Sequence, residues 1–221
     1  MTSRFFKRAS ASTCLVALGA CAEVALMSVT PMVAALASHF DQRTNRQIVE
    51  LEQKRDWPGM LGLARTQLER EPDRGEWWSL QGYALARQGQ HAAAVESYRQ
   101  AIRISPEDEV SWLAMGRSQS ELGLPKQAVK SYEQALRYRP ESAQAYLALA
   151  DFYQKQGQSD LALPNYRESV RYEPDLEPAW YGLAAAYHLT GQIKRRDAAL
   201  VGLRKLDPAA ADRFEKQYLS K

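Results

Sequence analysis

Residues 75–108 read GEWWSLQGYALARQGQHAAAVESYRQAIRISPED, and residues 109–142 read EVSWLAMGRSQSELGLPKQAVKSYEQALRYRPES. Both stretches are 34 residues long, and without any gap they align tryptophan, glycine, tyrosine and proline at the same positions. A fixed period of this size is typical of a solenoid of stacked units. The sequence therefore predicts an elongated body with a long surface and few enclosed pockets.

Three kinds of residue keep the 34-residue step through the rest of the chain. They are the prolines Pro72, Pro106, Pro140, Pro174 and Pro208, the glycines Gly89, Gly123, Gly157 and Gly191, and the aromatics Trp78, Trp112, Tyr146 and Trp180. Because Pro72 stands one step before Pro106, an earlier unit without the aromatic and glycine marks is expected to end there.

Each unit carries two apolar stripes at the spacing i, i+4, i+7, which predicts two helices. In the unit that starts at Gly75 these are Trp78, Gly82 and Leu85, and then Ala94, Tyr98 and Ala101. Gly89 is placed to end the first helix, and Pro106 follows the second, since proline cannot continue a helical ladder. We expect the periodic aromatics to lie in the buried stripe as core residues.

This pattern resembles the tetratricopeptide repeat, W-x2-L-G-x2-Y…A-x3-F…P over 34 residues. The resemblance implies an all-α, right-handed α-solenoid of stacked helix-turn-helix units. The stripe Ala211, Phe214 and Tyr218 predicts a C-terminal capping helix, because a terminal unit must cover its open apolar face. The expected division is a signal segment at 1–21, an apolar linker or packing helix at 22–40, a degenerate unit at 41–74, units at 75–108, 109–142, 143–176 and 177–208, and the cap at 209–221.

The composition excludes several classes of function. A formal net charge of +3 is too small to favour nucleic acid, which usually needs a concentrated basic stripe. No phosphate-binding loop, zinc-protease or nucleophile-elbow motif occurs, and the two cysteines both lie within the first 21 residues. We therefore expect no enzyme activity, no cofactor and no metal.

The N-terminus is typical of an export signal. Arg4, Lys7 and Arg8 precede an uncharged run from Ala9 to Ala20, as in a secretory signal. Leu18-Gly19-Ala20-Cys21 resembles a bacterial lipobox, in which the cysteine is acylated. Two alternatives stay open, namely cleavage at an ordinary A-x-A site and an uncleaved membrane helix. All three predict a bacterial envelope location facing the periplasm.

The apolar run continues beyond Cys21 to Ala37, which a polar lipoprotein tether would not explain. Thr30 and Pro31 suit a helix start, and Met32, Val33, Leu36 and Phe40 then fall on one helical face. This segment is expected to pack on the first unit as an alternative to entering lipid.

The resemblance places a concave groove along the first helix of each unit, and this groove is the expected partner site. Carried over by repeat position, its residues are Glu76, Tyr83, Arg87, Leu113, Arg117, Leu147, Asp151, Lys155, Tyr181 and His188. Such a mixed surface suits a partner peptide or an amphipathic helix. The alternatives are that Leu113 and Leu147 pack on adjacent units, or that another face binds.

The sequence thus favours a membrane-tethered scaffold for protein–protein interaction, assisting an envelope complex such as pilus or secretion machinery. By resemblance, a self-associating structural component and an accessory of polysaccharide export remain alternatives. Nothing in the sequence specifies the oligomeric state.

Overall fold

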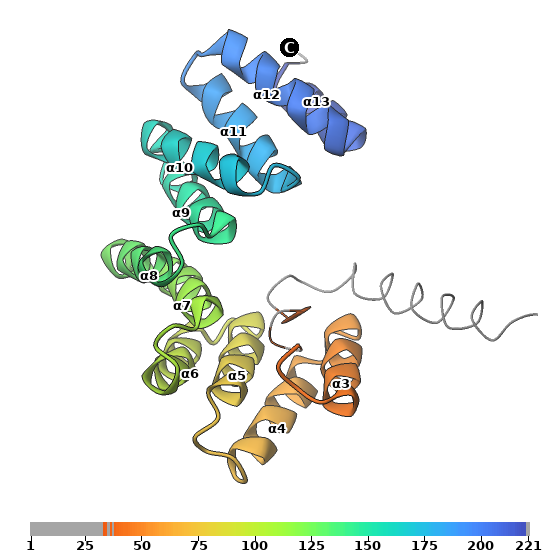
Figure 1. Cartoon of the computed structure of the whole chain (residues 1–221), viewed down its shortest axis with the longest axis vertical. Helices are drawn as coiled ribbons and strands as arrows, with labels where there is room; N and C mark the ends of the chain where they lie inside the picture. The colour runs from red at the N-terminus through yellow and green to blue at the C-terminus, as the bar shows by residue number, and fades with distance from the viewer. Residues whose placement is uncertain (1–32, 35, 37, 220–221) are drawn as a thin grey trace, which may run out of the picture.

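The computed structural model describes residues 33, 34, 36 and 38–219. Within these residues the chain forms eleven helices and no strand. The helices follow one another as antiparallel pairs that stack into a curved solenoid, with α6 and α8 on its outer side (Figure 1). In chain order they are α3 (Gln42–Gln53), α4 (Trp57–Leu68), α5 (Gly75–Arg87), α6 (His91–Ile104), α7 (Glu109–Glu121), α8 (Pro125–Tyr138), α9 (Ala143–Lys155), α10 (Ser159–Tyr172), α11 (Glu177–Leu189), α12 (Ile193–Leu206) and α13 (Pro208–Tyr218).

The expected turn chemistry is present at both kinds of helix end. Gly89, Gly123, Gly157 and Gly191 follow the first helices with φ between 70° and 75°, the left-handed region that favours glycine. Carboxylates and hydroxyls begin several helices; the Asp108 side chain accepts the Val110 N–H, and Ser142 Oγ accepts the Ala145 N–H. These local signals fix the period that the sequence shows.

The periodic tryptophans differ from the fully buried residues expected from the sequence. Trp78, Trp112 and Trp180 are only partly buried, although each packs against a core. Their indole Nε1 atoms donate to the carbonyl oxygens of Pro72, Pro106 and Pro174, at 2.7–2.9 Å. An indole has a polar edge that must find an acceptor, so the ring lies at the rim and ties the inter-unit turn to the first helix.

The tightest packing joins a glycine to a tyrosine. A Cβ on Gly82 would stand 2.7 Å from Tyr98 Cε1, and one on Gly116 would stand 2.6 Å from Tyr132 Cε1. Tyr98 and Tyr132 are 1% and 2% exposed. The glycines therefore let the two helices of a unit clasp a large ring between them.

The N-terminal segment packs on the first unit, which supports the packing alternative for this part of the apolar run. Val33, Leu36 and Phe40 are buried in the same core as Trp77. The Phe40 and Trp77 rings lie 4.1 Å apart, and Arg74 covers the Phe40 ring at 5.1 Å and donates to the His39 carbonyl. No helix in the described part of the chain is long and apolar enough to cross a bilayer.

The C-terminal helix α13 closes the other end of the solenoid. Ala210, Ala211 and Phe214 are fully buried against α11 and α12. Pro208 begins this helix, and the Asp207 side chain accepts the Ala210 N–H, so this proline opens the cap whereas Pro174 lies in a turn. Helix α13 therefore packs beside α11, the first helix of the last unit, where a further unit would otherwise stack.

Candidate partner-binding groove

At the N-terminal end of the predicted groove, the side chains are occupied by contacts within the protein. Tyr83 is 5% exposed, and its hydroxyl donates to Oε1 of the buried Glu52 at 2.8 Å. Arg87 lies over the Trp57 ring at 4.6 Å, and Glu76 pairs with Arg74 at 3.5 Å. These three predicted site residues are thus held by contacts with α3, α4 and the turn before α5.

In the middle of the groove, the apolar and charged positions behave differently. Leu113 and Leu147 are 8% and 6% exposed and pack in the cores, which is the alternative that the sequence left open for them. Lys155 pairs with Glu121 of the preceding unit at 2.6 Å. Arg117 is exposed and forms no ion pair within the described residues, so it is available to a partner.

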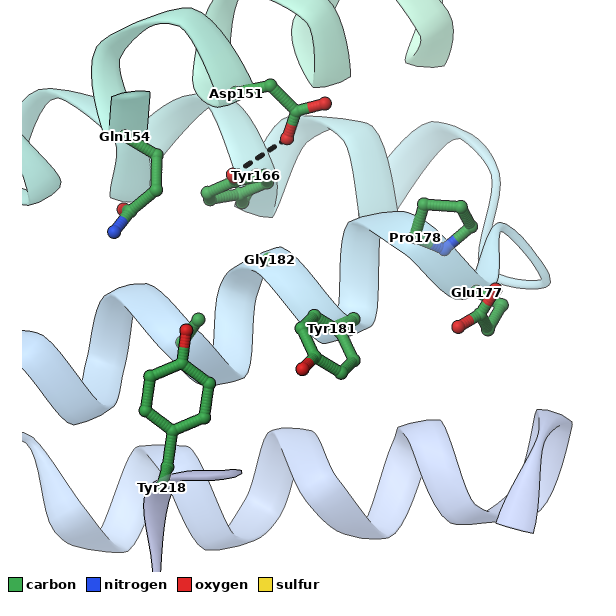
Figure 2. Close-up of a pocket in the computed structure, with 9 residues that line it drawn as sticks. Asp151, Gln154, Tyr166, Glu177, Pro178, Tyr181, Gly182 and Tyr218 are labelled. Atoms are coloured by element: carbon green, nitrogen blue, oxygen red, sulfur yellow. Dashed lines mark hydrogen bonds between the residues drawn. The ribbon is translucent and has the colours of Figure 1, made fainter. Parts of the chain in front are cut away.

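At the C-terminal end, a pocket of about 390 Å³ opens between α9, α11 and α13. We call it the C-terminal pocket (Figure 2). It is lined by Asp151, Gln154, Tyr166, Glu177, Pro178, Tyr181, Gly182, Ala185 and Tyr218. Asp151 and Tyr181 are predicted site residues, so the structure brings these two together at one cavity.

A change in the glycine pattern shapes this pocket. The unit at 143–176 has Ala150 at the position of Gly82 and Gly116. A Cβ therefore fills the space that a tyrosine ring occupies in the two units before it. Tyr166 lies instead against Gly182 of the next unit, whose added Cβ would stand 2.2 Å from Tyr166 Cε1. In this position the Tyr166 hydroxyl donates to Asp151 Oδ1 at 2.8 Å, as Figure 2 shows.

The carboxyl of Asp151 is electrostatically distinctive in this groove. Desolvation by the packed surroundings raises its pKa above the ordinary value, and the Tyr166 hydrogen bond and the charge of Arg117 only partly oppose this rise. Burial and the nearby Asp151 charge raise the pKa of Tyr166 in turn, so its hydroxyl stays protonated and acts as a donor. Asp151 is nevertheless an exposed residue that lines the pocket, and the Tyr166 hydroxyl is the hydrogen-bond donor that the structure gives to its carboxyl.

The aromatic wall of the pocket comes from α11 and α13. The Tyr181 hydroxyl donates to Gln217 Oε1 at 2.8 Å, and its ring meets Phe214 edge-on at 5.5 Å. His188, another predicted site residue, lies 5.3 Å from Tyr218 and 6.4 Å from Phe214. The cap thus covers part of the predicted stripe and adds Tyr218 to the pocket.

Sequence reasoning missed the two pocket tyrosines other than Tyr181. Residue spacing places Tyr166 in the core and Tyr218 in the cap, and both also line the cavity. The signal for Tyr166 was the shift from a glycine at the position of Gly116 to Ala150, with Gly182 following. Cys21, the predicted lipidation site, lies outside the described residues.

The described residues hold no group of three or more histidine, cysteine, aspartate or glutamate side chains suited to a metal ion. The pocket presents one histidine-free set of oxygen atoms and aromatic rings. These groups offer hydrogen bonds, negative charge and aromatic faces to a ligand.

Family models agree with the repeat architecture. Models described as tetratricopeptide repeat match residues 53–109 and 143–176, and one described as TPR repeat matches residues 126–157. The chain is a tetratricopeptide-repeat protein. This family architecture supports a scaffold for protein–protein interaction. A comparison with curated protein sequences found no significant match.

Solved tetratricopeptide-repeat structures share the fold at low sequence identity. The chain is similar to TTC0263, a thermophilic TPR protein in Thermus thermophilus, with 18% identity, TM-score 0.64 and coverage of 76% of this chain and 93% of that one. MamA shares 20% sequence identity with this chain at a TM-score of 0.58, and the match covers 76% of this chain and 94% of MamA. YrrB, described as a TPR protein with an unusual peptide-binding site, shares 17% identity at a TM-score of 0.57. The match covers 75% of this chain and 87% of YrrB.

Proposed function

We propose that this protein is a membrane-tethered scaffold that holds a segment of a partner protein in the groove. Its role would be to help assemble a bacterial envelope complex, such as pilus or secretion machinery. The observation that supports this proposal best is the C-terminal pocket, where Asp151 and three tyrosines line an open cavity. Arg117, one unit away, adds an unpaired charge that can orient the partner.

In-cell photocrosslinking tests the groove. A photoreactive amino acid at Ser120 or Gln144, both partly buried on first helices, is expected to give a discrete adduct with one protein. The same amino acid at Glu133, exposed on α8, serves as the control for the outer face. Adducts from Glu133 alone would contradict binding in the groove.

The membrane tether in this proposal rests on the sequence around Cys21. An acyl chain contributes about 0.8 kcal/mol per buried methylene, so the two or more chains of a lipoprotein give stable anchoring. Labelling with palmitate is expected to mark the wild type and not Cys21→Ser. An unlabelled wild type would remove the lipoprotein, leaving a cleaved signal or an uncleaved helix.

Self-association is a second candidate, favoured by apolar side chains exposed on the last unit. Leu189, Ile193 and Val201 are 56%, 46% and 57% exposed on α11 and α12. Exposed apolar side chains of this size are candidates for burial in an interface between two copies of the chain. Light scattering should detect a concentration-dependent oligomer that Val201→Glu dissolves. A monomer at every concentration would exclude this candidate.

A further inference from the structure

The C-terminal pocket is rich in hydrogen-bond acceptors and carries two carboxylates. Asp151 and Glu177 contribute carboxylates, and the single hydroxyl donor of Tyr166 is already used by Asp151. The Tyr181 hydroxyl is likewise committed to Gln217. The Tyr218 hydroxyl and the Gln154 amide group add donors, but neither carries a charge, so a ligand suited to the two carboxylates brings donors together with a positive charge.

Gln154 adds an independent observation. Its side chain lines the pocket, yet its amide oxygen Oε1 is buried and has no hydrogen-bond partner among the described residues. A buried acceptor without a donor costs free energy, which a donor entering the pocket would recover. Figure 2 shows Gln154 and Asp151 projecting from the same helix on one side of the cavity.

Tyrosine rings form much of the remaining wall. Tyr181 and Tyr218 both pack on Phe214, at 5.5 Å and 4.6 Å between ring centroids, which holds their orientation. Aromatic faces attract cations, and a guanidinium in particular stacks on them while it pairs with a carboxylate through two parallel hydrogen bonds. An arginine side chain meets both requirements better than a lysine does.

The cations nearest this pocket lie outside its lining. Arg117 lies on the preceding first helix and Arg213 on α13, and neither forms an ion pair with Asp151 or Glu177. Arg213 pairs with Asp207 instead, at 3.5 Å. The two pocket carboxylates therefore form no ion pair within the described residues, and the charge of Arg117 acts on Asp151 without direct contact.

We propose that the C-terminal pocket receives an arginine side chain of the partner segment. The guanidinium pairs with Asp151, donates to Gln154 Oε1 and lies against Tyr181 and Tyr218. This inference rests on the proposed function, since it specifies the chemistry of the segment that the groove binds. It gives the scaffold a fixed register, because one anchored side chain sets which residues of the segment meet Arg117.

Fluorescence anisotropy with the full-length chain in detergent micelles tests this assignment. The probe is fluorescein-labelled Gly-Ser-Ala-Arg-Ala-Ser-Gly amide, and its twins carry citrulline or lysine in place of arginine. Citrulline keeps the shape and removes the charge. The arginine probe is expected to bind about tenfold or more tightly than the citrulline twin, and more tightly than the lysine twin. Equal binding of either twin would overturn the assignment.

Two variants and a control locate the binding. Asp151→Asn should abolish the preference for arginine over citrulline, and Gln154→Leu should weaken the arginine probe several-fold. Glu133→Gln removes one negative charge from an exposed site on α8 and should leave binding unchanged. Circular dichroism melts verify that each variant is folded. A preference that survives in Asp151→Asn would overturn the proposal.

The pocket assignment and the proposed function can be rejected independently of each other. Adducts from Ser120 or Gln144 without a preference for the arginine probe would reject the pocket assignment and keep the groove. A clear arginine preference with adducts from Glu133 alone would keep the pocket and reject the groove as the partner site.

Discussion

The two ends of the groove are built from the same repeat positions and end in different states. In the first unit, Tyr83 is buried with its hydroxyl on Glu52, and Arg87 is stacked on Trp57. Two units further on, Asp151 holds the repeat position of Tyr83, and it lines an open pocket together with Tyr181 of the next unit. The N-terminal end is thus closed by its neighbours, whereas the C-terminal end is open to a ligand.

The difference comes from what packs against each end. The N-terminal side receives α3, α4 and the segment with Val33, Leu36 and Phe40. The C-terminal side receives only α13, which places Phe214 behind the tyrosines and leaves space in front of them. In a solenoid each unit touches only its neighbours, so the two ends can be specialised independently. The closed end would stabilise the body, and the open end would serve binding.

Loss of a fully buried ring should give the largest effect. Tyr98→Ala removes a side chain that is 1% exposed, and we expect a loss of about 3–5 kcal/mol in the free energy of unfolding. Tyr218→Ala, at the partly exposed edge of the pocket, should cost only about 1 kcal/mol. Chemical denaturation followed by tryptophan fluorescence measures both. Equal losses would mean that the open end carries as much stability as the closed one.

Adding a methyl group at two glycines that pack against tyrosine rings should give the next largest effect on stability. Gly82→Ala and Gly182→Ala place a Cβ 2.7 Å and 2.2 Å from a tyrosine ring, and overpacking of this kind costs about 1–3 kcal/mol. Gly182→Ala should in addition displace Tyr166 and weaken the arginine probe, which Gly82→Ala should not do.

A matched control exists for these glycines. Gly62 lies inside α4 with no atom within 4 Å of an added Cβ, so Gly62→Ala should stabilise the protein by about 0.5–1 kcal/mol. Thermal melts compare the three variants. If Gly182→Ala is as stable as Gly62→Ala, the close contact with Tyr166 does not exist in solution.

The sequence was sufficient to predict the helical solenoid, because periodic glycine and proline act locally on the backbone. It also predicted that Phe40 and its neighbours could pack on the first unit, whereas the binding groove along the first helices stays a prediction. Burial was harder to predict. The partial exposure of Trp112 depends on its indole bond to a carbonyl, and the pocket depends on where Tyr166 leans between two units. Both are contacts between segments, which residue spacing alone does not fix.

Removing one tyrosine hydroxyl at each end of the groove should change the free energy of unfolding by different, smaller amounts. Tyr83→Phe deletes the donor to Glu52, a buried carboxylate whose Oε2 already has no partner among the described residues. We expect a cost of about 1–3 kcal/mol. Tyr181→Phe deletes a bond to Gln217 on the surface and should change stability by less than about 0.5 kcal/mol.

A second substitution tests the reason for the Tyr83 effect. Glu52→Gln in the Tyr83→Phe background removes the buried charge, so it should restore part of the lost stability. Denaturation midpoints of the two single variants and the double variant form a thermodynamic cycle. Strict additivity of the two substitutions would show that Tyr83 and Glu52 do not interact.

The smallest expected effect is a gain in stability at the open end. Because desolvation raises the pKa of Asp151 in the folded protein, ionising this carboxyl costs more in the folded chain than in the unfolded chain. That cost is present in full above the folded pKa, and it disappears as the pH falls through that value toward the unfolded one. Asp151→Asn avoids the cost and keeps an oxygen for the Tyr166 hydroxyl. Asp151 is exposed, so solvent screens much of this cost, and at pH 7.5 the variant should be only slightly more stable than the wild type, by less than about 0.5 kcal/mol. Melting temperatures compared between pH 7.5 and pH 4 should show the difference shrinking as the pH is lowered. A variant less stable than the wild type at pH 7.5 would mean that the ionised Asp151 carboxyl stabilises the fold, which would contradict the cost assigned to its ionisation here.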